Sequence, residues 1–196
     1  MESIVQKSIE AGVTIDQEQV ETLMDLVAYH ESARTMDPSI RQKSNVKNEK
    51  GEVIGSTEGP GRGLYQYELE TLGGSGAGRV AMNRLYAALG GDLIAGKKPA
   101  DMPKWMDKYF SVNASGHHEA SGDVDFSELT EEQQKILFLA DKLQDPGVKL
   151  SDIGVMSDAE WWAKYHHKGA DSNVQKFSDD AARYLKGEFR ELHNIE

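Results

Sequence analysis

Apolar residues recur at helical spacing in several stretches of this chain. The clearest stripe is Val20, Leu23, Met24 and Val27, which follow the i, i+3, i+4, i+7 pattern of a half-buried helix. Capping boxes of the form Ser/Thr-x-x-Glu/Gln begin at Thr14, Thr130, Ser157 and Ser172 and mark helix starts. The pattern predicts helices at 15–33, 77–89, 101–110, 131–143, 158–167 and 173–186.

One interval breaks the helical period. Residues 45–56 alternate weakly about Lys50-Gly51, which predicts a small β-hairpin. Residues 111–127 carry no periodic pattern and predict a loop. We therefore expect a mainly α protein with a small hairpin. It would have a first region at 1–110, the loop at 111–127 and a helical C-terminal region at 128–196 that packs on the same unit.

Composition narrows the function classes. The 196 residues are 38% hydrophobic, which suffices for a core, and the formal net charge is −11. An acidic surface repels phosphate backbones, so we expect no nucleic-acid partner. The polar N-terminal stretch does not read as a signal peptide, and no apolar run approaches the roughly 20 residues of a membrane-spanning helix. We expect synthesis in the cytoplasm and no membrane insertion.

The first helical stripe, extended by one turn, reaches Glu31. A glutamate on that face points to the core or a cleft, where partial burial raises a carboxyl pKa and suits it to general acid catalysis. The alternative is a solvated helix end, or an ion pair with Arg34. On position alone we favour the alternative.

A glycine-rich stretch, GPGRGLYQ at 59–66, changes that balance. Its glycines allow a tight turn and a close approach to a ligand. Tyr65 offers a flat apolar face, and Gln66 can donate and accept hydrogen bonds. Sugars are recognised by this combination of a stacking face and amide groups.

Together the two stretches resemble a known signature. Glu31-Ser32, Asp37-Pro38, Ser44 and the run from Gly61 to Gln66 are similar to the motifs of lytic transglycosylases and goose-type lysozymes. The resemblance covers about residues 15–90. Glu31 and Gln66 are 35 residues apart, more than is typical of these families, and an insert at 45–58 accounts for most of the excess.

The resemblance implies a lysozyme-like fold in which the hairpin follows the catalytic helix. It implies that Glu31 is the single catalytic acid and base, and that peptidoglycan is cut between N-acetylmuramic acid and N-acetylglucosamine without a cofactor. The substrate-binding residues that it implies are Ser32, Gly63, Leu64, Tyr65, Gln66 and Asn83. For Ser32, a helix-end hydroxyl bonded to backbone is an equal alternative.

The stretch GRGLYQYE also resembles wall-degrading virion proteins of tailed phages. This favours an enzyme carried in the virion that acts on periplasmic peptidoglycan, with other virion proteins as partners, over an enzyme released at lysis. The competing hypothesis is a structural virion protein with a lysozyme-like fold and no activity. A hydrolase would need a second carboxylate, and Glu58, Glu68 and Glu70 are candidates, with Glu68 nearest the motif.

Two further residue groups invite functional interpretations. Trp161, Trp162 and Tyr165 could line a distal sugar subsite, but their helical spacing favours a core role. HESAR lacks the second histidine of H-E-x-x-H, and the histidine pairs at 117–118 and 166–167 do not form a ligand triad. We expect no metal site.

Overall fold

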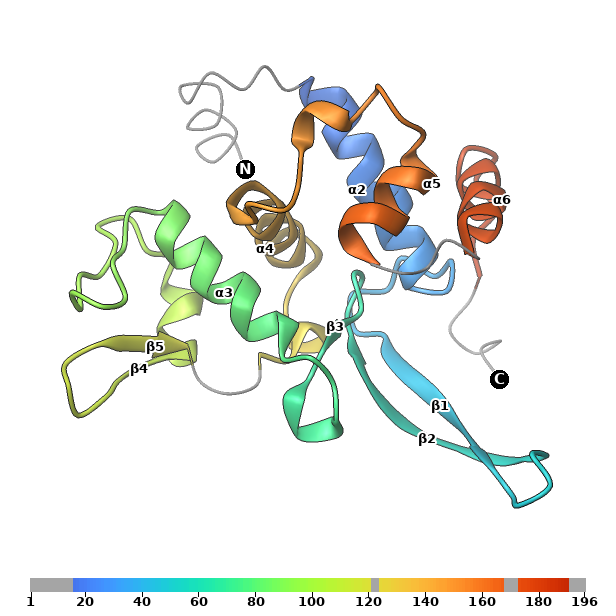
Figure 1. Cartoon of the computed structure of the whole chain (residues 1–196), viewed down its shortest axis with the longest axis horizontal. Coiled ribbons are helices and arrows are strands. Elements are labelled where there is room, and N and C mark those ends of the chain that lie inside the picture. Colours follow the sequence, from blue (N-terminus) through green and yellow to red (C-terminus); the bar gives the residue numbers. More distant parts are fainter. Residues whose placement is uncertain (1–15, 121–123, 168–172, 191–196) are drawn as a thin grey trace.

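Helices and a small antiparallel sheet share the chain (Figure 1). The structure is a computed structural model that describes residues 16–120, 124–167 and 173–190. Its content is 46% helix and 17% strand. The protein is therefore mixed α and β with a substantial helical part, and the expectation of a mainly α protein holds only in that coarser form.

Helix α2 (Gln17–Glu31) carries the predicted apolar stripe. It begins at Asp16, whose side chain accepts hydrogen bonds from the next backbone N–H groups, whereas the predicted capping box at Thr14 lies outside the described residues. All four stripe residues are buried: Val20, Leu23, Met24 and Val27. The helix stops at Glu31 because three of the next five residues adopt positive φ: Ala33, Arg34 and Met36.

Three further helices match the predicted positions closely: α3 (Ala77–Ala88), α4 (Glu131–Gln144) and α6 (Val174–Tyr184). The capping box at Thr130 is present with both reciprocal hydrogen bonds, as is the one at Ser157. The box predicted at Ser172 lies outside the described residues. Side-chain capping thus sets the start of α4 and α5 as the sequence indicates.

Two predicted α-helices have a different geometry. The segment expected at 158–167 is a short α5 (Asp158–Trp161) that continues as a π-helical turn, η5 (Trp162–His166). The segment expected at 101–110 is a 3₁₀ helix, η2 (Lys104–Tyr109). Pro103 precedes it and a strand follows at Phe110, so only six residues are helical. 3₁₀ geometry is typical of such short helical connectors, although six residues is long for it.

The predicted hairpin is present and is longer than expected. Strands β1 (Arg41–Lys47) and β2 (Val53–Arg62) pair antiparallel about the Lys50-Gly51 turn, and β3 (Tyr67–Glu68) pairs with the end of β2. Figure 1 shows this hairpin extending away from the helices as an arm. The first half of the glycine-rich stretch therefore lies in β2, and its second half, at 63–66, forms the turn into β3.

The prediction of an unstructured loop at 111–127 is wrong in part. Strands β4 (Phe110–Val112) and β5 (His118–Ala120) form a second hairpin. The turn between them is closed by the side chain of Asn113, which accepts hydrogen bonds from the backbone N–H groups of Ser115 and His117. The remaining short helical turns are η1 (Glu70–Leu72), η3 (Phe126–Glu128) and η4 (Leu150–Asp152).

One hydrophobic cluster runs from α2 to α6 and includes Leu64, Phe138, Trp161, Trp162 and Phe177. The two tryptophans and Tyr165 are almost fully buried, which agrees with the core role that their spacing favours. No helix within the described ranges is long and apolar enough to cross a membrane.

Candidate functional site

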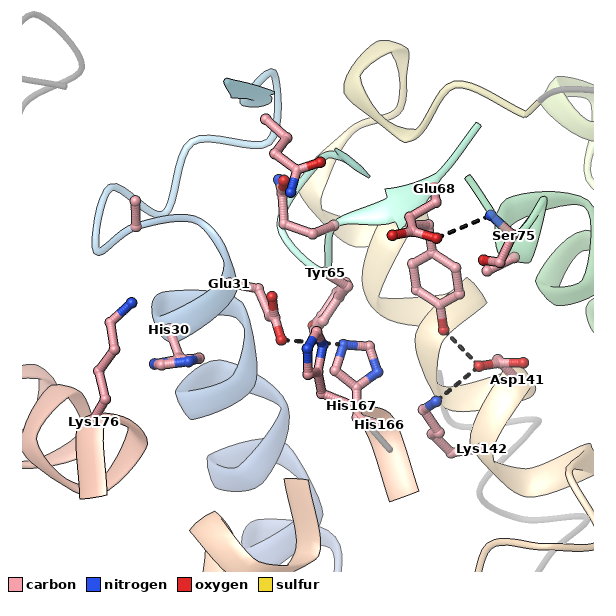
Figure 2. Close-up of a pocket in the computed structure, with 15 residues that line it drawn as sticks. His30, Glu31, Tyr65, Glu68, Ser75, Asp141, Lys142, His166, His167 and Lys176 are labelled. Atoms are coloured by element: carbon pink, nitrogen blue, oxygen red, sulfur yellow. Dashed lines mark hydrogen bonds and ion pairs between the residues drawn. The ribbon is translucent and has the colours of Figure 1, made fainter. Parts of the chain in front are cut away.

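A cavity of about 610 Å³ lies where the end of α2 meets the glycine-rich turn. Its walls also include the ends of α4 and η5 and one side of α6. Figure 2 shows Glu31 pointing toward the His166-His167 segment, with Asp141 and Lys142 beyond it. The structure thus brings together two predicted motifs and the C-terminal helical region.

Glu31 is the last residue of α2, and its side chain is 13% exposed. The indole N–H of Trp162 donates a hydrogen bond to its Oε1 at 2.7 Å. Nε2 of His166 lies 3.7 Å from the same oxygen. The alternative ion pair with Arg34 does not form, since that guanidinium faces Asp180 at 3.9 Å.

Burial raises the pKa of the Glu31 carboxyl above its ordinary value. The Trp162 hydrogen bond opposes this shift, as do Coulombic interactions with His167, Lys176 and Lys142. A carboxyl group whose protonated form persists to higher pH, in contact with a cavity, can act as a general acid.

The glycine-rich turn brings Gln66 to the same cavity. Gly63 has φ +69°, and a Cβ at this position would lie 2.3 Å from Oε1 of Gln134. Only glycine therefore fits between the turn and α4. Gln66 itself has φ +50°, and its Nε2 donates to the Gly63 carbonyl at 2.7 Å while its side chain lines the cavity.

Tyr65 lines the cavity from within the core. Its ring stacks on Phe138 with centroids 4.2 Å apart, and the residue is 1% exposed. So little exposed surface leaves no open face for a sugar ring to stack on. Tyr65 is therefore part of the wall rather than the exposed platform that the sequence suggests.

The other four predicted binding residues do not line this cavity: Ser32, Gly63, Leu64 and Asn83. Ser32 is fully buried, and its hydroxyl accepts a hydrogen bond from the Met36 N–H at 3.0 Å, which fits the helix-end alternative. Leu64 is also fully buried, and its N–H donates to Gln134. Ser32, Gly63 and Leu64 shape the helix end and the turn instead of facing the cavity, and Asn83 lies on α3.

Of the three candidate second carboxylates, only Glu68 lines the cavity. It accepts a hydrogen bond from the Ser75 N–H at 2.9 Å (Figure 2). Glu58 is instead paired with Arg62 at 2.7 Å, and Glu70 with Arg79 at 3.1 Å.

Several cavity residues were not predicted from the sequence. Asp141 accepts a hydrogen bond from the Tyr67 hydroxyl at 2.7 Å and lies 3.0 Å from Nζ of Lys142. Nδ1 of His30 lies 2.8 Å from Asp180. The available signal was weak: Asp141 and Lys142 follow each other on the predicted helix 131–143, but nothing in the sequence places their helix face beside Glu31.

His166 is a largely buried basic group of the cavity, with a side chain that is 10% exposed. Burial lowers its pKa well below the ordinary value, so its ring is neutral at neutral pH. Within the part of the chain that the structure describes, no three histidines or carboxylates are arranged to hold a metal ion. At the other histidine pair, His118 is bonded to the Tyr86 hydroxyl at 2.8 Å.

Comparison with known protein families, with characterised proteins and with solved structures finds no significant match to this chain. The functional interpretation therefore depends on the cavity itself and on the short motifs that border it.

Proposed function

We propose that this protein cleaves the β-1,4 glycosidic bond between N-acetylmuramic acid and N-acetylglucosamine in peptidoglycan, with Glu31 as general acid and base. The observation that carries the proposal is Glu31 itself, a mostly buried carboxyl group with a raised pKa at a cavity wall. Gln66, from the second half of the motif, lines the same cavity and brings an amide for a sugar substituent.

The order of elements supports a lysozyme-like arrangement. A helix ends at the glutamate, a β-hairpin follows, and a glycine-rich turn returns the chain to the cavity. This order is the one implied by the resemblance to lytic transglycosylases and goose-type lysozymes.

In the proposed reaction, Glu31 donates its proton to the glycosidic oxygen as the bond from C1 to that oxygen breaks. The bonding electrons leave with the oxygen, and C1 gains oxocarbenium character that the neighbouring acetamido group stabilises. The Glu31 carboxylate then takes a proton from the sugar's own 6-hydroxyl, whose oxygen bonds to C1 and closes an anhydro ring. One carboxyl group suffices for this sequence.

We further propose a tailed-phage virion as the setting, in which the enzyme opens peptidoglycan locally. The support is the likeness of GRGLYQYE at 61–68 to wall-degrading virion proteins.

The test is mass spectrometry of peptidoglycan digested with wild type, Glu31→Gln and Glu68→Gln. The amide of Glu31→Gln is nearly isosteric but cannot donate the proton, so we expect at least a thousandfold loss of products. Muropeptides that end in 1,6-anhydro-muramic acid, retained in Glu68→Gln, would support the one-carboxylate mechanism.

Reducing ends lost in both variants would instead indicate hydrolysis with Glu68 as the second carboxylate. Activity of Glu31→Gln within tenfold of wild type would overturn the assignment of Glu31. No products from folded wild type would favour the structural virion protein.

A further inference from the structure

The chain leaves α-helical geometry at the point where it meets Glu31. The π-helical turn η5 spans Trp162–His166, and its first and last residues both approach the same carboxylate oxygen. Single π-helical turns are rare and occur frequently at functional sites. This turn therefore helps to determine the position of the Glu31 carboxyl group.

The Trp162 indole is fixed by its neighbours. The residue is 2% exposed and stacks on Phe177 at 5.2 Å between ring centroids, with His30 edge-on at 4.7 Å. The His167 ring also stacks nearly parallel to it, with ring centroids 5.4 Å apart. A ring packed this closely cannot turn its N–H away from Glu31.

The two oxygens of Glu31 have different surroundings. Oε1 accepts the Trp162 hydrogen bond and has Nε2 of His166 at 3.7 Å, beyond hydrogen-bond reach. Oε2 accepts no hydrogen bond from any residue that the structure describes, while the side chain borders the cavity. One oxygen is therefore held, and the other is available to a ligand.

We propose that Trp162 is a positioning residue whose indole N–H holds Oε1 of Glu31, so that Oε2 alone exchanges a proton with the ligand. The proposal rests on the proposed function for the identity of the reaction, but the hold on the carboxyl group can be tested without it. It makes the C-terminal helical region part of the site rather than an extension.

Charged and titratable groups from several elements line the same cavity as Glu31, including Glu68 on β3 and Asp141 on α4. His30 precedes it on α2, His166 and His167 lie in and after η5, Lys176 is on α6 and Lys142 is on α4. The Trp162 hydrogen bond stabilises the charged carboxylate and lowers its pKa, whereas burial raises it. Removing the indole N–H should therefore raise the pKa of Glu31 further.

The experiment compares Trp162→Phe with Trp161→Phe. Trp161 is the adjacent residue and is 1% exposed, and its indole N–H has no hydrogen-bond partner among the described residues. Both variants lose one buried indole, but only Trp162→Phe loses the hydrogen bond to Glu31.

We expect kcat to fall at least tenfold in Trp162→Phe, with KM within twofold of wild type. We also expect the alkaline limb of the pH–rate profile to move to higher pH. Trp161→Phe should leave the limb in place.

Side-chain ¹³C NMR of Glu31 gives a readout that needs no activity. If wild type cleaves peptidoglycan but neither the limb nor the titration moves in Trp162→Phe, the positioning role is overturned and the proposed function stands. The other case is that wild type cleaves no peptidoglycan in this test. In that case, a Glu31 titration that moves to higher pH in Trp162→Phe, and not in Trp161→Phe, still supports the positioning role of Trp162. A Glu31 titration that is unchanged in Trp162→Phe overturns that role.

A final measurement covers the case in which Trp162→Phe does not fold. In wild type, one indole ¹H–¹⁵N signal should follow the titration of Glu31, and this response should vanish in Glu31→Gln. Indole signals that ignore the Glu31 titration in wild type would overturn the proposal.

Discussion

At the residue scale, backbone conformation sets the two edges of the cavity. Ala33 and Gln66 both line it, and both have positive φ without being glycine. Such conformations cost on the order of 1–3 kcal/mol each and gather at functional sites, where the surrounding structure enforces them. Here Gln66 is held by its own hydrogen bond to the Gly63 carbonyl.

Gly63 is the residue on which the motif turn depends most. In Gly63→Ala the new Cβ would meet Gln134 Oε1 at 2.3 Å and Phe126 Cβ at 2.9 Å, at φ +69°. We expect a loss of about 2–4 kcal/mol in the free energy of unfolding, measured by urea denaturation.

Gly116 provides the matched control for this substitution. It has φ +79° in the β4–β5 turn, and a Cβ there would meet nothing within 4 Å. Gly116→Ala should cost only the backbone strain, about 1–2 kcal/mol. Equal losses in the two variants would contradict the close contact between the turn and α4.

Sequence reasoning located the cavity at Glu31 and Gln66 because both lie at ends of locally encoded elements. It could not distinguish which motif residues face the cavity. Ser32 and Leu64 belong to the same motif but point into the core, since a turn sends successive side chains in different directions. The sequence predicts Trp162 as a core residue, and only the three-dimensional structure, in which Trp162 of η5 lies beside the end of α2, reveals its hydrogen bond to Glu31.

At the element scale, α4 holds the glycine-rich turn through one buried glutamine. Gln134 accepts from the Leu64 N–H at 2.7 Å, and the two hydrogens of its amide nitrogen are shared among the carbonyls of Pro38, Phe126 and Leu129. It is fully buried. Two segments that are distant in the sequence, at Pro38 and Leu64, and the segment just before α4 thus share one side chain.

Gln134→Ala should therefore destabilise the protein strongly. The four backbone groups would lose a partner in a buried place, and we expect a loss of about 3–5 kcal/mol by urea denaturation. The neighbouring Gln133→Ala removes only half of the capping box at Thr130 and should cost about 0.5–1 kcal/mol. Similar losses in the two variants would argue against a special role for Gln134.

Helix periodicity and capping are local, so the sequence predicts α2, α3, α4 and α6 well. The π-helical turn and the second hairpin at 110–120 were missed for the opposite reason. Both depend on contacts with distant segments. The β5 residue His118, for example, bonds to Tyr86 on α3.

At the scale of the whole molecule, the protonation of Glu31 makes the free energy of unfolding depend on pH. Its pKa is raised in the folded state, so the folded protein binds this proton more tightly than the unfolded chain does. The contribution of this proton to the free energy of unfolding is complete below the pKa of about 4.3 that a glutamate has in the unfolded chain. It is lost as pH rises through the pKa of Glu31 in the folded protein. Above that window the buried charge destabilises the fold.

Glu31→Gln should therefore raise Tm relative to wild type at pH 8 but not at pH 4. For a chain of this size, each kcal/mol gained corresponds to about 2–4 °C. Glu68→Gln removes the same charge from the same cavity and should gain less. A Tm difference between Glu31→Gln and wild type that is equal at both pH values would contradict the raised pKa.

The β1–β2 arm closes on itself, with Arg41 opposite Arg62 at its base and Lys47 opposite Val53 near its tip. Buried Arg62 donates to the carbonyls of Gly59 and Gly61 in its own strand, and Arg41 of β1 pairs with Glu58 of β2 at 3.2 Å. The chain between Glu31 and Gln66 thus forms a hairpin that leaves the helical part of the protein and returns to it at the same place. A foreign peptide grafted between Lys47 and Val53 would be displayed far from the cavity, which makes this arm a practical handle for tagging or immobilising the protein.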